Sequence, residues 1–203
     1  MPAKETGGAG RRREFDPSEK AAEAVDVFRT HGYRGTTTRH LETTLGVNQS
    51  SLYRVFRSKQ ELLGAALDHY GHFTEEVLLA PLRDGSSGLD DVRAYFDRLE
   101  AGIGCGCLLV ALMGELSDEV DDVVARTAHY RRDISASIGA ALDRAVTIGE
   151  IAASTAEARA DLLMATVLGV NIAARGGADQ AELTRLLDAA RDELDNWRST
   201  ESS

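Results

Sequence analysis

The chain has 203 residues, which is enough for one or two domains and a sizeable core. Its formal net charge of −10 argues against nucleic acid, but residues 1–60 hold eleven Lys or Arg against seven Asp or Glu, and the remainder holds twelve against twenty-six. This distribution indicates a basic unit that contacts a polyanion, joined to an acidic body. An ordinary solvated helical surface is the alternative explanation for the acidic part.

No run approaches the roughly 18 apolar residues that a membrane-spanning helix needs, and the most apolar run covers only residues 105–113. No apolar segment follows the basic residues near the start, so we expect no targeting peptide. Two cysteines without such a peptide favour a reducing compartment. We therefore expect a cytoplasmic chain without a membrane partner.

In chain order, residues 1–14 come first; they are rich in Gly and Arg and lack apolar periodicity, which predicts a flexible basic arm. The arginines at 11–13 either lie along a DNA backbone or minor groove, or form an ordinary solvated charge run. Asp16 as a cap and Pro17 in the first turn predict a helix, which Gly32 ends.

Residues 38–56 predict two short helices joined by a tight turn. A leucine pair spaced by four ends at Gly46, where a helix stops and the backbone needs a positive φ. Asn48 can cap the next helix through its side-chain oxygen. Leu52 and Phe56, again four apart, pack the second helix onto the first. This arrangement is a helix-turn-helix, which reads DNA with its second helix.

These residues resemble the DNA-binding domain of TetR-family transcriptional regulators. The resemblance covers about a quarter of the chain, and Glu42 and Thr44 depart from it because the family often has alanines there. It implies a dimeric DNA-binding regulator whose C-terminal part binds a small molecule. The matching residues are Phe28, Gly32-Tyr33, Thr36-Thr37, Leu41, Gly46-Val47, Ser51-Leu52-Tyr53, Phe56, Lys59 and Leu62-Leu63.

The second short helix offers side chains suited to base edges and phosphates. Gln49 can pair with adenine and Arg54 with guanine, and a phosphate contact is the alternative for Arg54. The resemblance implies phosphate contacts for residues that flank this helix. The predicted DNA-binding residues are Thr37, Thr38, Gln49, Ser50, Ser51, Tyr53, Arg54 and Lys59; Thr37 also caps the first short helix.

The remainder is rich in Ala, Leu, Arg and Glu and lacks hairpin signals, so the predicted fold class is all-α. An N-terminal three-helix helix-turn-helix domain precedes a C-terminal helical ligand-binding and dimerisation domain. The predicted division is a basic arm at 1–14, the DNA-binding domain at 15–62, the regulatory body at 63–197 and a tail at 198–203. The spacing predicts body helices over about 59–79, 90–100, 108–116, 119–147, 155–175 and 179–197, with a loop at 81–88.

The last two predicted helices carry leucines at helical spacing with many alanines between them. Either they form a monomer core, or they form a four-helix dimer interface, as the family resemblance implies. A single small DNA-binding unit contacts few base pairs, which favours a homodimer on a palindrome. The predicted dimerisation residues are Leu162, Leu168, Ile172, Leu186 and Leu187.

Thinly spread aromatic and sulfur-containing side chains in the body suggest an effector pocket between helices, or else a dry core. The predicted ligand-binding residues are Tyr70, Phe73, Phe96, Cys107, Met113, Tyr130 and Met164. The predicted partners are therefore a palindromic double-stranded operator, a small-molecule effector and a second copy of the chain.

Cys105 and Cys107 leave two further hypotheses open: a thiol- or metal-responsive switch, or simple packing of small residues. His69 and His72 lie one turn apart, but we expect them to face solvent, and we predict no metal site. No sequence motif for catalysis or a cofactor occurs, so we predict neither. An acidic helical adaptor without DNA binding is the alternative outside the regulator class.

Overall fold

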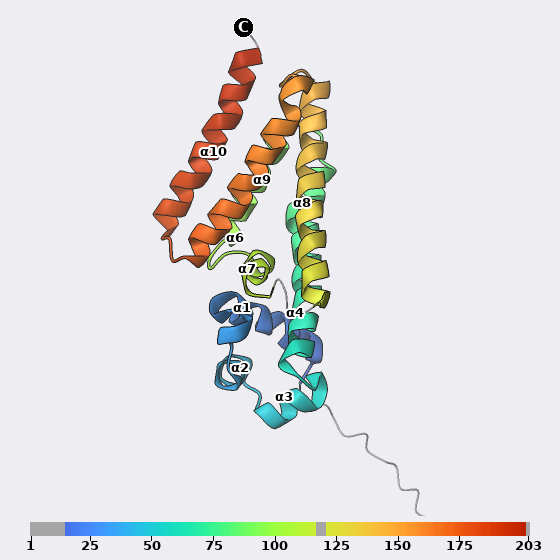
Figure 1. Cartoon of the computed structure of the whole chain (residues 1–203), viewed down its shortest axis with the longest axis vertical. Helices are drawn as coiled ribbons and strands as arrows, with labels where there is room; N and C mark the ends of the chain where they lie inside the picture. The colour runs from blue at the N-terminus through green and yellow to red at the C-terminus, as the bar shows by residue number, and fades with distance from the viewer. Residues whose placement is uncertain (1–14, 117–120, 202–203) are drawn as a thin grey trace, which may run out of the picture.

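The computed structural model describes residues 15–116 and 121–201, and every regular element in those residues is a helix. The predicted all-α fold is confirmed (Figure 1). The elements are α1 (Pro17–Gly35), α2 (Thr38–Leu45), α3 (Gln49–Phe56), α4 (Lys59–Thr74), the π-helix η1 (Glu75–Leu79), α5 (Ala80–Arg83), α6 (Leu89–Gly102), α7 (Leu108–Glu115), α8 (Asp121–Thr147), α9 (Ala153–Arg175) and α10 (Gln180–Glu201).

Helices α1 to α3 form one end of the molecule (Figure 1). Their ends lie where the local sequence predicts them, except that α1 continues past Gly32 to Gly35. The Asp16 side chain accepts a hydrogen bond from the Ser18 N–H, and Asn48 caps α3 in the same way. Gly46 ends α2 in the left-handed region, at φ 63°. These caps satisfy backbone groups that a helix end leaves unpaired.

Helix α4 leaves the helix-turn-helix end and continues through η1 and α5 to Arg83, so the helical path is longer than predicted. The predicted loop began at Pro81, but this proline lies in the first turn of α5, directly after the π-helix η1. The predicted boundary between residues 62 and 63 falls inside α4, which packs against α1.

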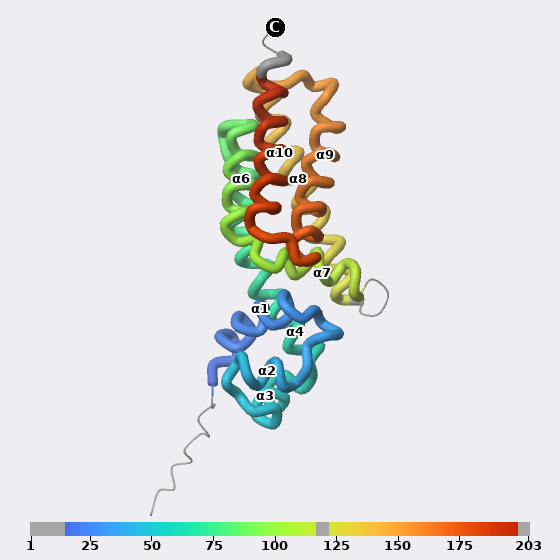
Figure 2. The backbone as a smooth tube through the Cα atoms, turned by 90° about the vertical axis from the view of Figure 1, so that its left-hand side faces the viewer, coloured from blue at the N-terminus to red at the C-terminus, as the bar shows by residue number. Residues whose placement is uncertain are grey.

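The body is a bundle in which α8 packs against α9, while α5 and α6 cover another side of α8. Helix α10 lies between α6 and α9 (Figure 2). It runs to Glu201, past the predicted start of the tail at 198, because Arg198 pairs with Asp90 at 2.7 Å and Glu150 at 2.6 Å. Within the described ranges, no helix is both long and apolar enough to cross a membrane.

A polar joint connects α1 to the body. Gly32 interrupts α1 with φ 69° and ψ 174°, and the next N–H, that of Tyr33, donates to Glu115 Oε2 at 2.7 Å. Arg175 Nη2 lies 3.5 Å from Glu115 Oε1, while its Nη1 donates to the Arg29 carbonyl at 2.7 Å. Residues far apart in sequence thus hold the helix-turn-helix end on α7 and α9.

Candidate nucleic-acid interface and effector cavity

Helix α3 presents an exposed polar face at the tip of the molecule. Gln49, Ser50 and Arg54 are exposed, whereas Leu52 and Phe56 are buried against the other helices. Two turns of helix therefore carry an amide, a hydroxyl and a guanidinium outward. These groups can donate and accept hydrogen bonds at base edges and phosphates.

A carboxylate from α2 lies at the N-terminus of α3, and the sequence alone did not predict a functional role for it. Glu42 Oε1 accepts a hydrogen bond from the Gln49 N–H at 2.6 Å, beside the Asn48 cap on Ser51. No short-range capping motif joins residues seven apart, so only the fold brings them together. A helix N-terminus attracts anions, and here a side chain of α2 supplies one.

Two of the predicted DNA contacts also have partners within the protein. Ser51 is 4% exposed, and its Oγ accepts from Arg54 Nη2 at 3.4 Å, so the hydroxyl faces the protein. Lys59 Nζ donates to the carbonyls of Tyr33 and Thr36 at 2.8 and 2.9 Å, and it lies 4.4 Å from the Tyr33 ring centroid. Lys59 therefore ties α4 to the turn between α1 and α2, with two of its three donors already used.

The other predicted contacts lie around α3. Thr37 is exposed and caps α2 by accepting from the His40 N–H at 3.2 Å, while Thr38 and Tyr53 are half-buried. Burial raises the pKa of Tyr53, so its phenol remains a hydrogen-bond donor at neutral pH. The arginines at 11–13 lie outside the described residues.

Four of the seven predicted ligand residues meet at one cavity of about 50 Å³ between α1, α4, α6, α8 and α9. They are Tyr70, Phe73, Cys107 and Tyr130. The other three predicted ligand residues require correction. Phe96 is fully buried against Tyr95. Met113 and Met164 pack against the core and line neither this cavity nor the larger hollow between α4, η1 and α8. Helical spacing alone did not separate the side of each helix that faces the cavity from the side that faces the core.

The cysteine segment before α7 lies at this cavity. Cys107 is 6% exposed; its N–H donates to Asn171 Oδ1 at 2.8 Å and its thiol to the Tyr130 hydroxyl at 3.6 Å. Arg29, from α1, donates to the carbonyls of Gly102, Ile103 and Gly106 at 2.9–3.1 Å. The segment is therefore held mainly through its main chain.

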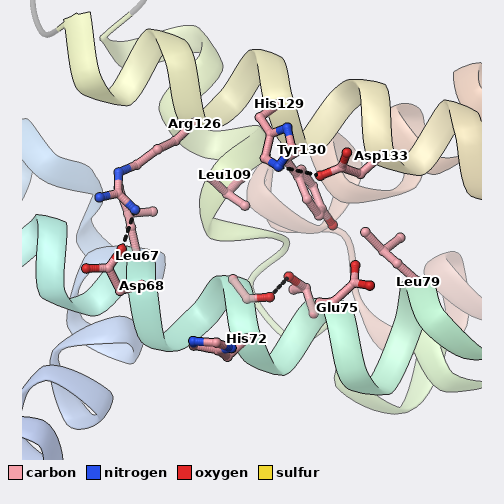
Figure 3. A pocket seen from close by; sticks show the side chains of 12 residues that line it. Leu67, Asp68, His72, Glu75, Leu79, Leu109, Arg126, His129, Tyr130 and Asp133 are labelled. Atoms are coloured by element: carbon pink, nitrogen blue, oxygen red, sulfur yellow. Dashed lines mark hydrogen bonds and ion pairs between the residues drawn. The ribbon is translucent and has the colours of Figure 1, made fainter.

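A second, more polar hollow of about 320 Å³ lies between α4, η1 and α8 (Figure 3). Arg126 spans it to reach Asp68 at 2.5 Å, and His129 lies 3.2 Å from Asp133. His69 and His72 are exposed, and no cluster of three or more potential metal ligands occurs among the described residues.

Two sequence families match the chain. The family "Bacterial regulatory proteins, tetR family" matches residues 22–66, and "Tetracyclin repressor-like, C-terminal domain" matches residues 88–190, which is half of the chain.

The chain belongs to the TetR family of transcriptional regulators. It is 30% identical over 87 residues to the uncharacterized HTH-type transcriptional regulator YezE of Bacillus subtilis, which covers 43% of the chain and 45% of YezE. It is 28% identical over 126 residues to the HTH-type transcriptional repressor BdcR of Escherichia coli, which covers 59% of the chain and 64% of BdcR. Each alignment therefore spans less than two thirds of the relative.

Solved TetR-family structures share the fold over most of the chain. A cysteine-substituted CifR bound to a 26-bp double-strand operator DNA is 26% identical, with a TM-score of 0.76 over 93% of this chain and 100% of CifR. A regulator from Agrobacterium tumefaciens is 26% identical, with a TM-score of 0.74 over 89% and 98%. A Chloroflexus aurantiacus regulator, 21% identical with a TM-score of 0.74 over 91% and 94%, supports the fold alone. These relatives confirm a DNA-binding regulator rather than an enzyme.

Helices α9 and α10 of this TetR-family chain carry exposed apolar side chains, which we call the apolar stripe. Leu162, Ile172 and Leu186 are 49%, 56% and 43% exposed, and Leu168 is half-buried. Leu187 needs correction as a dimerisation residue, because it is fully buried within its own subunit. Neighbouring positions on a helix point about 100° apart, so Leu187 faces the core and only Leu186 belongs to the exposed stripe.

Replacing Glu42 by Gln is expected to tighten DNA binding by about 0.3–1 kcal/mol, because it removes a negative charge from the N-terminus of α3 and keeps an oxygen acceptor for Gln49. Fluorescence anisotropy titrations on duplex DNA at two salt concentrations measure the change. Glu182→Gln, in the first turn of α10, is the matched control and is expected to leave affinity unchanged. Equal affinity of Glu42→Gln and the original protein would contradict a repulsive role for this carboxylate.

Proposed function

We propose that this regulator binds a palindromic operator as a homodimer, acts as a repressor and leaves the operator when a small molecule binds in its body. The exposed polar face of α3 carries this proposal, with Gln49 and Arg54 as base-reading residues. The operator complex of CifR and the repressor role named for BdcR support it by analogy. Its place of action is then the cytoplasm.

The stripe on α9 and α10 is the proposed dimer interface. Large apolar side chains that remain exposed on two packed helices of one subunit are typical of a surface that a partner covers. A two-fold axis through this interface directs two α3 helices to half-sites about 34–36 Å apart. We accordingly assign residues 15–62 to operator binding, and the body beyond them to dimerisation and effector binding.

Helix α4 is the proposed lever between effector and operator. Its first residue, Lys59, is tied to the turn before α2, and its far end brings Tyr70 and Phe73 to the cavity. An effector that favours one position of α4 changes the separation of the two α3 helices only if it binds that arrangement more tightly. The low exposure of Cys107 favours a reversible ligand over a thiol reaction at this place.

Replacing Arg54 by Ala tests operator reading. The expected loss in specific binding is about 1–3 kcal/mol, together with a relaxed preference at one base position, because a bidentate contact to guanine is removed. Selection of bound duplexes from random sequence, followed by affinity measurement on the selected site, reads out both effects. Arg185→Ala, an exposed arginine on α10, removes the same charge away from α3 and is expected to keep both affinity and preference. Unchanged base preferences for Arg54→Ala would exclude the base-reading role.

A further inference from the structure

The lining of the cavity at Tyr70 and Cys107 includes cationic side chains but no carboxylate. Its lining includes two arginines, Arg29 from α1 and Arg98 from α6, and no Asp or Glu. This composition is unusual in an acidic body, where arginines such as Arg191 and Arg198 pair with carboxylates of the neighbouring helices.

The two arginines differ in how their guanidinium groups are satisfied. Arg29 donates to three main-chain carbonyls and lies 3.5 Å from the exposed Asp26. Arg98 Nη1 is buried without a hydrogen-bond partner, and among residues 15–116 and 121–201 no carboxylate lies within 4.0 Å of its guanidinium. A buried guanidinium N–H without an acceptor is costly to the fold, so its presence beside a cavity points to an anionic ligand.

The other residues that line the cavity indicate the size and polarity of that anion. Tyr70 and Tyr130 offer phenol hydroxyls, whose pKa is raised chiefly by burial, so they stay protonated as donors. Phe73 and Val77 form an apolar side of the cavity, and their side chains are 49% and 37% exposed, respectively. Val77 belongs to the π-helix η1, a type of irregularity that is frequent at functional sites. A volume of about 50 Å³ suits a small ligand with one charged end.

We propose that this cavity binds small monocarboxylates, with the carboxylate on Arg98 and the apolar end toward Phe73 and Val77. This inference rests on the proposed function for its effect on operator binding, and on the cavity alone for ligand binding. A carboxylate forms charge-assisted hydrogen bonds with a guanidinium, whereas the matching amide has the same shape and no charge.

Acetate and propionate, with acetamide and propionamide as neutral counterparts, test the proposal on the full chain without DNA. We expect both acids to raise the melting temperature in a saturable way and both amides to leave it unchanged. Arg98→Met is expected to weaken carboxylate binding about ten- to hundredfold, the loss of one or two hydrogen bonds to a charged group. The ligand-free variant should melt at the same temperature as the original protein or higher, because a buried N–H without an acceptor is gone.

Arg93→Met is the matched control, since Arg93 lies on the same helix and pairs with Asp195 on α10 instead of lining the cavity. It should keep carboxylate affinity. Equal stabilisation by the amides, preferential binding of inorganic phosphate, or unchanged affinity in Arg98→Met would overturn the proposal. Operator retention is measured separately: release by propionate supports the effector role, whereas absence of any operator binding refutes the proposed function and leaves the ligand result standing.

Discussion

Replacing Ile172 by Glu is expected to convert the protein from a dimer to a folded monomer and to weaken operator binding by about 10²–10⁴-fold. The side chain is 56% exposed in one subunit and lies on the same stripe as Leu162 and Leu186. A carboxylate there stays solvated in the monomer but must be buried in the dimer, where an unpaired charge is strongly unfavourable. Loss of the second DNA-binding unit removes the gain that comes from linked binding.

Sedimentation and operator titrations measure these two effects. Ile148→Glu is the matched control, because Ile148 is also 56% exposed but follows the end of α8, away from the stripe. It is expected to remain dimeric and to bind the operator normally. A dimer that persists in Ile172→Glu would place the interface on another surface.

The replacement of Gly32 by Ala is expected to lower the free energy of unfolding by about 2–4 kcal/mol. Its φ of 69° and ψ of 174° lie in a region that is essentially restricted to glycine. An added Cβ would also lie 2.0 Å from Glu115 Oε1 and 2.7 Å from Arg175 Nη2, so the joint between α1 and the body must open. Urea denaturation measures the loss.

Two other glycines separate the causes of that loss. Gly46 has a φ of 63° and open space around its added Cβ, so Gly46→Ala reports the backbone strain alone, about 1–2 kcal/mol. Gly64 lies inside α4 with open space and is expected to gain about 0.5–1 kcal/mol as Ala. If Gly32→Ala loses no more stability than Gly46→Ala, the contact with Glu115 contributes nothing to the fold.

The helix ends were predictable because their determinants are local. Asp16, Thr37 and Asn48 each cap a helix within three residues of their own position, and Gly46 provides the left-handed turn between α2 and α3. Such signals depend on the chain only over one helical turn, so tertiary packing does not change them. The helix-turn-helix could therefore be predicted from the sequence almost residue by residue.

The roles of Lys59, Glu42 and Leu187 were not predictable in this way. The ammonium of Lys59 reaches carbonyls 23 and 26 residues away, and the Glu42 carboxylate reaches the next helix. Leu186 and Leu187 both fit an apolar helical stripe, and only the packing of α10 against α6 and α9 decides which one is buried. The spacing of apolar residues locates the buried face of a helix only to within one position. That precision is too low to distinguish core residues from interface residues.

Arg29 holds the segment before α7 in a way that tolerates substitution of that segment's side chains. Every residue type carries the same carbonyl, so the three hydrogen bonds from Arg29 do not depend on the side chains at Ile103 or Cys105. Gly106 is the exception, because an added Cβ would lie 2.7 Å from the Asn171 carbonyl oxygen. Side chains that border the cavity can therefore be replaced without loss of this connection between the body and the DNA-binding end.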